Sequence, residues 1–117
     1  MSPHDPPSDD ILIGDTARLV RRARRALGSV TGVADLLRVE RTTVDAWLVG
    51  AVTPSPAQRR VLRDLATVVD RLRALPRGRV PPGWLRTPCG ALDDATPEDV
   101  LVVDGAERVL DAIDRMS

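Results

Sequence analysis

Residues 31–50, TGVADLLRVERTTVDAWLVG, decide the fold of the first half of the chain. The helical spacing of their apolar side chains predicts two short helices, joined by a turn at residues 38–40. Thr31 is of a residue type that caps helix N-termini, so we expect the first short helix to begin there. Val44, Trp47 and Leu48 fall on one side of the second helix, so we expect this side to face a core.

An amphipathic helix is predicted just before this stretch. Its pattern begins at Asp15, which with Thr16 offers a cap, and it stops at Gly28. Five arginines stand between its apolar positions: Arg18, Arg21, Arg22, Arg24 and Arg25. Such a basic face is either a solvated surface or a contact for phosphate groups, and the sequence leaves both readings open.

A long helix is predicted after the two short ones. Ser55 would cap it, Pro56 suits its first position, and the apolar pattern continues to Leu75. Its apolar residues recur nearly in heptads, so this helix could bury against the preceding helices, against a second copy, or against both. Prolines and glycines in residues 76–83 prevent it from continuing.

Two further helices are predicted in the last third. Thr96 and Pro97 mark the start of a short helix that ends near Gly105. The last helix carries Val109, Leu110 and Ile113 on one face. No strand pattern competes anywhere, so the predicted fold is all-α. The predicted organisation is a flexible lead at 1–14, a helical unit that includes the long helix at 15–75, a linker at 76–83 and a small helical domain at 84–117.

The composition argues against an enzyme or a metalloprotein. The 117 residues include one cysteine, Cys89, and one histidine, His4, too few for a disulfide or a zinc site within one chain. The glycines are dispersed, without the Gly-rich loop that holds phosphate. Acidic residues cluster around Asp93, and a solvated loop explains them better than paired acid–base catalysis does. We therefore predict no catalytic residue, no metal site and no cofactor.

Hydropathy predicts a cytoplasmic protein without a membrane partner. No apolar run approaches the roughly 18 to 20 residues that span a bilayer. The first ten residues, MSPHDPPSDD, lack the positive and apolar regions of a secretory signal.

A net charge of zero conceals a strong asymmetry along the chain. Residues 16–87 contain 15 Arg and 5 acidic residues, whereas residues 88–117 contain 2 Arg and 8 acidic residues. Every basic residue is Arg, whose planar guanidinium binds phosphate through two parallel hydrogen bonds. A basic body suits nucleic acid, and an acidic end indicates a second, different partner.

Residues of the first half recur at the spacing of a DNA-binding motif: Thr31, Val33, Ala34, Leu37, Val39, Arg41 to Val44, Trp47, Gly50 and Pro54. Through them the chain resembles the Xre, or Cro/C1-type, helix-turn-helix family over about residues 15–70. The resemblance implies that the second short helix lies in the DNA major groove. Carried over by position, the DNA-binding residues are Thr31, Arg41, Thr42, Thr43, Asp45 and Ala46. Arg41 is the candidate for guanine readout, and Thr31 would lie near the phosphates.

A second set of residues recurs in the last third: Trp84, Leu85, Thr87, Pro88, Ala91, Leu92, Thr96, Pro97, Leu101, Gly105, Val109 and Ile113. Through them, residues 83–114 resemble the toxin-binding domain of Xre/MbcA/ParS antitoxins. The resemblance implies a cognate toxin with an RES domain, a class of NAD-degrading enzymes. It further implies that the antitoxin blocks access to the toxin's active site and that the complex represses its own operon.

The last third carries an acidic module that suits a basic pocket which normally receives a dinucleotide. The module comprises Asp93, Asp94, Glu98, Asp99, Asp104, Glu107, Asp111 and Asp114. We expect Trp84 and Leu92 in the core and the partner on the exposed surface of the last helix. The predicted partner-binding residues are Arg86, Asp93, Asp94, Glu107, Asp111, Asp114, Arg115, Met116 and Ser117. Relatives often carry a longer tail that reaches into the toxin's cleft. Three alternatives follow: residues 115–117 form the plug, the toxin is covered without insertion, or the protein no longer has a toxin partner.

Three functions compete at this point. The leading hypothesis is a type II antitoxin that neutralises an RES-type toxin and regulates its operon through operator DNA. The alternative is a stand-alone Xre-type transcriptional regulator without a toxin partner. The third is a protein-interaction adaptor whose helix-turn-helix does not bind DNA. We expect a homodimer, or a higher hetero-oligomer with the toxin, because a helix-turn-helix usually reads two half-sites.

Overall fold

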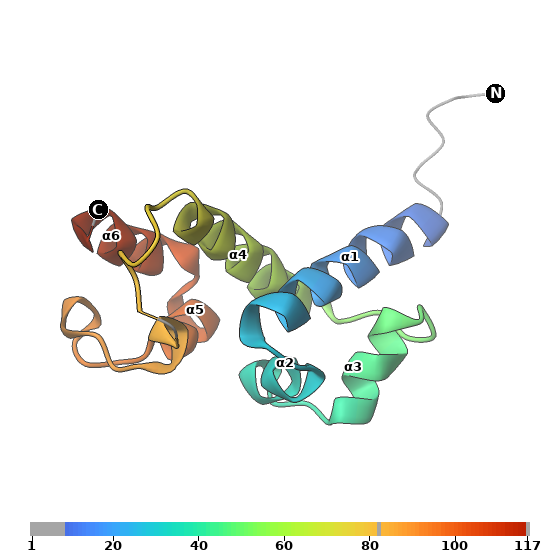
Figure 1. Cartoon of the computed structure of the whole chain (residues 1–117). Coiled ribbons are helices and arrows are strands. Elements are labelled where there is room, and N and C mark those ends of the chain that lie inside the picture. The colour runs from blue at the N-terminus through green and yellow to red at the C-terminus, as the bar shows by residue number, and fades with distance from the viewer. Residues whose placement is uncertain (1–8, 82, 117) are drawn as a thin grey trace. The chain divides into compact units, whose positions relative to one another are not determined.

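The computed structural model describes residues 9–81 and 83–116, with side chains from Thr16 onward. Figure 1 shows the elements in chain order. Those of the described residues are α-helices and two short 3₁₀ helices. No strand occurs in the part of the chain that the structure describes, where Cys89 and Ala95 form an isolated bridge. The predicted all-α fold is confirmed.

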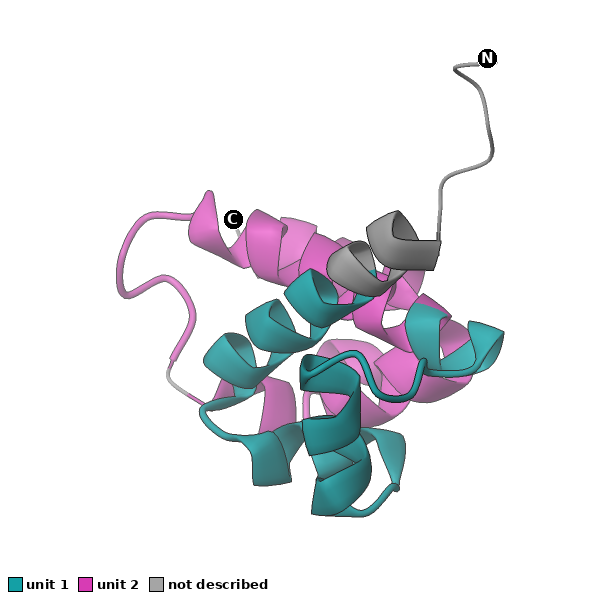
Figure 2. Cartoon of the chain, turned by 90° about the vertical axis from the view of Figure 1, so that its right-hand side faces the viewer, with its two compact units in different colours: residues 1–59 teal, residues 60–117 magenta. Residues whose placement is uncertain are grey.

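The chain divides into two compact units, residues 1–59 and 60–117, which Figure 2 colours separately. The division falls inside α4 (Pro56–Arg73), between Arg59 and Arg60. Most of the long helix therefore groups with the C-terminal unit. The sequence instead predicts the boundary at the linker, residues 76–83.

The first unit is built from α1 (Asp9–Leu27), α2 (Val30–Leu37) and α3 (Arg41–Leu48). Each of these three helices packs against the other two. Val20 of α1, Val33 of α2 and Val44 of α3 are completely buried, and Trp47 is 2% exposed. The prediction for this side of α3 is confirmed at Val44 and Trp47, whereas Leu48 is half-buried. The wide apolar face of each short helix makes this packing favourable, since helices of eight residues are marginal on their own.

Two predicted helix starts in this unit were wrong. The first helix begins at Asp9, so Asp15 and Thr16 lie inside it and do not cap it. The second helix is capped by Ser29, whose hydroxyl accepts a hydrogen bond from the Gly32 N–H, while Thr31 lies inside it. Ser and Thr are both good caps, so residue type alone could not separate them. The predicted stop at Gly28 is confirmed, since its φ of 90° ends the helix.

α4 begins as predicted. The Ser55 hydroxyl accepts a hydrogen bond from the Gln58 N–H at 3.1 Å, and the Gln58 side-chain oxygen accepts one from the Ser55 N–H at 2.8 Å. This reciprocal pair is a capping box. The helix ends at Arg73, two residues before the predicted Leu75, which still lies in a turn because its N–H bonds to the Leu72 carbonyl. The apolar stripe is buried at Val61, Leu62, Leu65, Ala66, Val68 and Val69.

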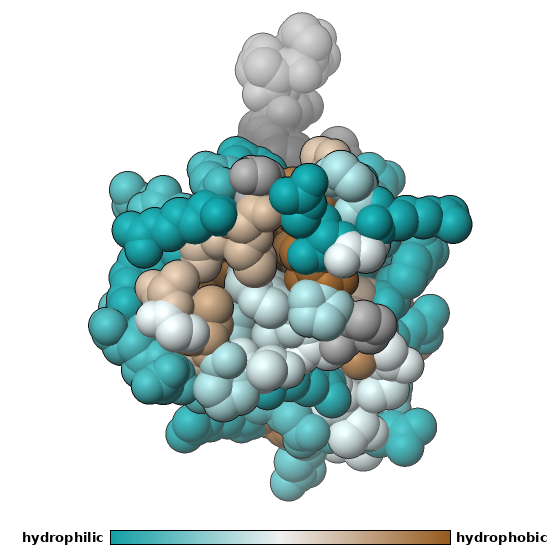
Figure 3. Space-filling model, turned by 60° about the vertical axis from the view of Figure 1, so that its left-hand side comes forward, coloured by the Kyte–Doolittle hydropathy of each residue, from teal (hydrophilic) through white to brown (hydrophobic). Residues whose placement is uncertain are grey.

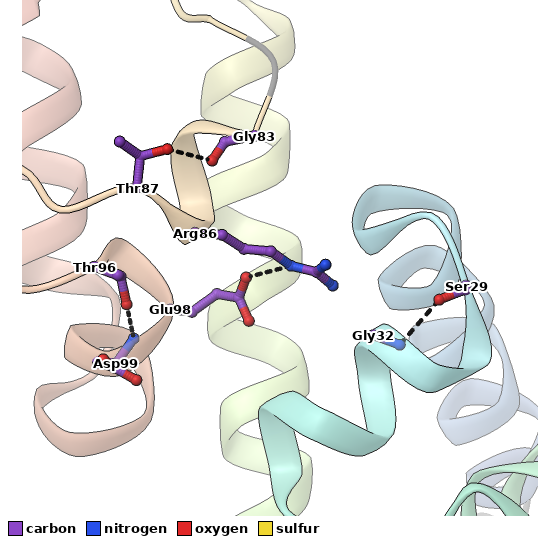
Figure 4. Close-up of polar contacts among 8 residues, drawn as sticks. All are labelled: Ser29, Gly32, Gly83, Arg86, Thr87, Thr96, Glu98 and Asp99. Carbon is purple, nitrogen blue, oxygen red and sulfur yellow. Dashed lines mark hydrogen bonds and ion pairs between the residues drawn. The ribbon is translucent and has the colours of Figure 1, made fainter.

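The last part of the chain folds into η1 (Trp84–Arg86), η2 (Gly90–Leu92), α5 (Pro97–Asp104) and α6 (Ala106–Met116). α5 packs against α6 and η1, and α6 packs against η2. The expected core positions are confirmed, since Trp84 is 7% and Leu92 2% exposed. α5 starts at the predicted Thr96–Pro97 pair, where the Thr96 hydroxyl accepts a hydrogen bond from the Asp99 N–H (Figure 4).

Candidate functional site

The outer side of α3 carries most of the residues predicted to touch DNA. Arg41, Thr42 and Asp45 are exposed, and Thr43 and Ala46 are half-buried. The helix packs inward through Val44 and Trp47, so the predicted contact residues lie on the sides left open by that packing. Thr31 is exposed on α2 and is the one predicted DNA contact outside α3.

The turn between α2 and α3 sets the angle at which α3 is presented. Arg38 ends α2 in the left-handed conformation, with φ 55° and ψ 46°. The Val39 N–H donates to the Ala34 carbonyl at 3.0 Å, which closes the end of the helix. Glu40 precedes α3 without a side-chain capping bond. Arg41, the predicted guanine reader, is therefore the first residue of a helix whose N-terminal N–H groups receive no side-chain cap from Glu40.

An acidic turn stands out in the second unit. The Cys89 N–H donates to the Ala95 carbonyl at 3.0 Å, and the Asp94 N–H donates to the Cys89 carbonyl at 2.9 Å. These bonds close a loop in which Asp93 and Asp94 both have positive φ, 58° and 65°. Aspartate tolerates that conformation better than most residues. Both predicted partner contacts are exposed, and the Asp93 side chain is 94% accessible.

Arg108 links the acidic turn to α5. One of its terminal nitrogens lies 2.7 Å from Asp104 Oδ2, and the other lies 3.4 Å from Asp93 Oδ2. Both carboxylates stay largely accessible while the guanidinium holds them, because the three side chains are between 42% and 94% exposed. Asp99 and Asp104, which the sequence analysis placed in the acidic module, belong to this surface, and so does Arg108, which it did not select.

The exposed side of α6 carries four predicted partner contacts: Glu107, Asp111, Asp114 and Arg115. The helix packs inward through Val109, Ala112 and Ile113. Arg71 of α4 pairs with Asp114, and Arg79 donates to the Met116 carbonyl at 3.2 Å. Met116 is half-buried, and Ser117 lies outside the described residues. The end of α6 is thus held by two arginines of its own unit.

Arg86, the remaining predicted contact, is engaged within the domain. Its Nε lies 3.0 Å from Glu98 Oε2, an ion pair that joins η1 to the first turn of α5 (Figure 4). Glu98 is 13% exposed and Arg86 is 52% exposed at the side chain. The Thr87 hydroxyl donates to the Gly83 carbonyl on the same turn. Arg86 therefore joins η1 to α5 while about half of its side chain stays exposed.

An exposed apolar residue, Val103, is the feature of this unit that the sequence analysis missed. Val103 of α5 is 78% exposed and borders a hollow between α5, the acidic turn and α6. The run VLVV at residues 100–103 was the available signal. Four consecutive apolar residues point around most of a helix, so one of them faces outward unless another element covers it.

The described residues contain no group of three or more His, Cys, Asp or Glu side chains placed to hold a metal ion. Among the helices described, none is long and apolar enough to cross a membrane.

Residues 82–117 match the family of the antitoxin Xre/MbcA/ParS C-terminal toxin-binding domain. The predicted resemblance of this segment to that toxin-binding domain is confirmed. The match does not extend into residues 1–81, so the helix-turn-helix resemblance of the first half stays a prediction. No curated protein and no solved structure matches the chain.

Proposed function

We propose that this protein is the antitoxin of a type II toxin–antitoxin system in the cytoplasm. It binds and neutralises an RES-domain toxin that degrades NAD, and it represses its own operon by binding operator DNA. It acts by occupying the toxin's surface and not by catalysis. The observation that carries the proposal is the toxin-binding family match over residues 82–117.

The charges of the matched segment support a basic partner site. Its exposed carboxylates include Asp93, Asp94, Glu107 and Asp111. A pocket that receives a dinucleotide must attract phosphates, so its rim is expected to be positive and to attract these carboxylates as well. The positive rim of the toxin's pocket would attract an antitoxin with this surface, so the antitoxin would associate rapidly and compete with the substrate for the pocket.

The toxin-binding half is tested by co-expression with the protein encoded beside this chain's gene. We expect the neighbour alone to stop growth and to lower cellular NAD, and we expect co-expression to restore both and to yield a complex that co-purifies. A neighbour that is harmless and forms no complex would refute the antitoxin function. Binding to the chain's own promoter in that case would leave the stand-alone regulator as the function.

The end of α6 needs a separate test, because a plug and a cover neutralise differently. We expect deletion of residues 115–117 to reduce neutralisation if the tail inserts into the toxin's cleft. A truncated chain that still restores growth and NAD fully would show neutralisation by cover. Arg79, which donates to the Met116 carbonyl, supplies a control. Arg79→Ala removes the hydrogen bond to the Met116 carbonyl but leaves residues 115–117 in place.

The DNA-binding half is supported by the exposure of Arg41 and Thr42 at the start of α3 and by the Arg-rich composition of residues 16–87. We expect Arg41→Ala to weaken binding to a promoter duplex by about 5- to 150-fold, since a bidentate guanine contact contributes roughly 1 to 3 kcal/mol. Arg73→Ala, at an exposed position at the end of α4, is the matched control. Unchanged gel shifts for Arg41→Ala would refute the readout assignment.

A further inference from the structure

The most unusual surface of the second unit is the hollow beside Val103. Its floor is apolar, because Leu92 and Val100 are 2% and 4% exposed. Its rim is formed by Val103 and by charged side chains: Asp93, Asp99, Asp104 and Arg108. The hollow measures about 260 Å³, several times the roughly 30 Å³ that one water occupies in the liquid. It has room for a side chain of another protein.

The exposure of Val103 indicates that no other described element of the unit packs over this hollow. Within the run at residues 100–103, Val100 and Leu101 are buried and Val102 is half-buried, whereas Val103 is 78% exposed. A helix that is apolar around most of its circumference is normally enclosed on all sides. Figure 3 shows one face of the molecule on which apolar residues reach the surface among hydrophilic ones. A single exposed valine is common, but here it continues a buried apolar floor to the surface.

The rim is held in position before any partner arrives. Arg108 bonds to Asp104 at 2.7 Å and to Asp93 at 3.4 Å, and so ties the end of α5 to the acidic turn. Arg108 spans the rim of the hollow, and Leu92 and Val100 form its floor. Side chains that are already ordered lose less conformational entropy on binding, so a partner gains more from each contact.

We propose that this hollow is the anchor site for the toxin: it receives an aliphatic side chain of the toxin that is flanked by arginine or lysine. The inference rests on the proposed function, because residues 82–117 are a toxin-binding domain and the hollow lies inside them. Three carboxylates against one guanidinium make the rim acidic, which excludes the phosphates of DNA as the occupant.

Two surfaces of the domain then contribute to toxin binding in different ways: the apolar hollow beside Val103 and the carboxylates of α6. The apolar floor and Val103 exclude water at the centre of the contact, where truncations cost most affinity and mainly raise the dissociation rate. The carboxylates on α6, Glu107 and Asp111, lie outside the hollow's floor and attract the basic toxin from a distance. Their loss mainly lowers the association rate.

The chain offers a matched pair of variants for the test. Val103 and Val49 are the same residue type and are both 78% exposed, but Val49 follows α3 in the first unit. We expect Val103→Lys to weaken binding of the toxin encoded beside the gene by at least about 30-fold, because hot-spot losses exceed roughly 2 kcal/mol. Val49→Lys should stay within about threefold of the wild type. Binding is measured by calorimetry or biolayer interferometry on the full chain.

Each outcome bears on the inference. If the wild type binds and Val103→Lys binds within threefold of it, the hollow is not the anchor, and the antitoxin function stands. If the wild type does not bind, the proposed function and this inference fail together. If Val103→Lys alters self-association in light scattering while toxin binding is unchanged, the hollow receives a second copy, and the inference is overturned.

A folding control keeps the test decisive. Lysine near the C-terminus of a helix suits the dipole, so Val103→Lys should leave the melting temperature close to that of the wild type. Val103→Ser serves as a second variant, since it removes the apolar contact without adding a charge. We expect it to weaken binding about tenfold. Equal affinity of Val103→Ser and the wild type would contradict the inference even if Val103→Lys destabilised the domain.

Discussion

Two connections between helices depend on the backbone conformation of a single residue, Gly105 or Arg38. Gly105 connects α5 to α6 with φ 92° and ψ −171°, a region that essentially only glycine occupies. Arg38 ends α2 with φ 55° and no such freedom. One joint therefore has the residue that its conformation requires, and the other does not. The two positions lead to opposite predictions for substitution.

Gly105→Ala should destabilise the chain. A Cβ at this position would lie 3.4 Å from Arg60 Nη1 and from Asp64 Oδ2, which are bonded to each other at 2.7 Å. The 3.4 Å between the added Cβ and these atoms is ordinary contact. The loss of stability, about 1 to 3 kcal/mol, therefore comes from the backbone conformation. Urea unfolding followed by circular dichroism measures it. Gly90→Ala is the control, because nothing lies within 4 Å of its added Cβ.

Arg38→Gly should stabilise the chain by about 1 kcal/mol, since a left-handed residue with a Cβ costs roughly 1 to 2 kcal/mol that glycine avoids. The gain is partly offset because Arg38 places a positive charge at the C-terminus of α2. The same urea unfolding detects the change. A lower free energy of unfolding for Arg38→Gly would show that the Arg38 side chain makes a stabilising contact that outweighs the strain.

At the scale of the element, local sequence specified some helix starts and missed others. Ser55 with Gln58 and Thr96 with Pro97 begin α4 and α5 where the pattern of caps predicted. At α2 two cap types compete within three residues, and Ser29 caps the helix instead of Thr31. A cap is decided by which residue adopts an extended backbone, as Ser29 does with φ −166° and ψ 164°.

Ser55→Ala should cost about 1 kcal/mol, because it breaks one half of the capping box and leaves the Gln58 N–H without its acceptor. Thr53→Ala, two residues earlier at an exposed position, is the control and should change stability by less than about 0.5 kcal/mol. Thermal unfolding of the full chain distinguishes them. Equal melting temperatures of Ser55→Ala and the wild type would mean that water replaces the cap without loss.

At the scale of the whole molecule, the division inside α4 is the main result. Arg60 donates to the Val102 carbonyl at 2.8 Å and Arg71 pairs with Asp114, so α4 is bonded to both helices of the matched domain. The domain that the family match defines, residues 82–117, is a short segment of a larger compact unit. Chains near 40 residues rarely bury enough surface to fold alone.

Two fragments separate the possible boundaries. We expect residues 56–117 to unfold cooperatively on heating, because they keep the buried stripe of α4 together with the Arg60 and Arg71 bonds. Residues 76–117, which start at the predicted linker, should show low helix content and no cooperative transition. Far-UV circular dichroism measures both. Cooperative unfolding of the shorter fragment would support the boundary at residues 76–83.

Local pattern alone was enough for the all-α fold, for the inward faces of α3 and α6, and for the resemblance of residues 82–117 to the antitoxin toxin-binding domain. Each depends on residue type and spacing within a few turns of helix. The grouping of α4 with the C-terminal unit and the exposure of Val103 required the tertiary structure. An apolar side chain is buried only if another element covers it. Which elements meet depends on contacts between residues that are far apart in the chain, and helical periodicity does not encode those contacts.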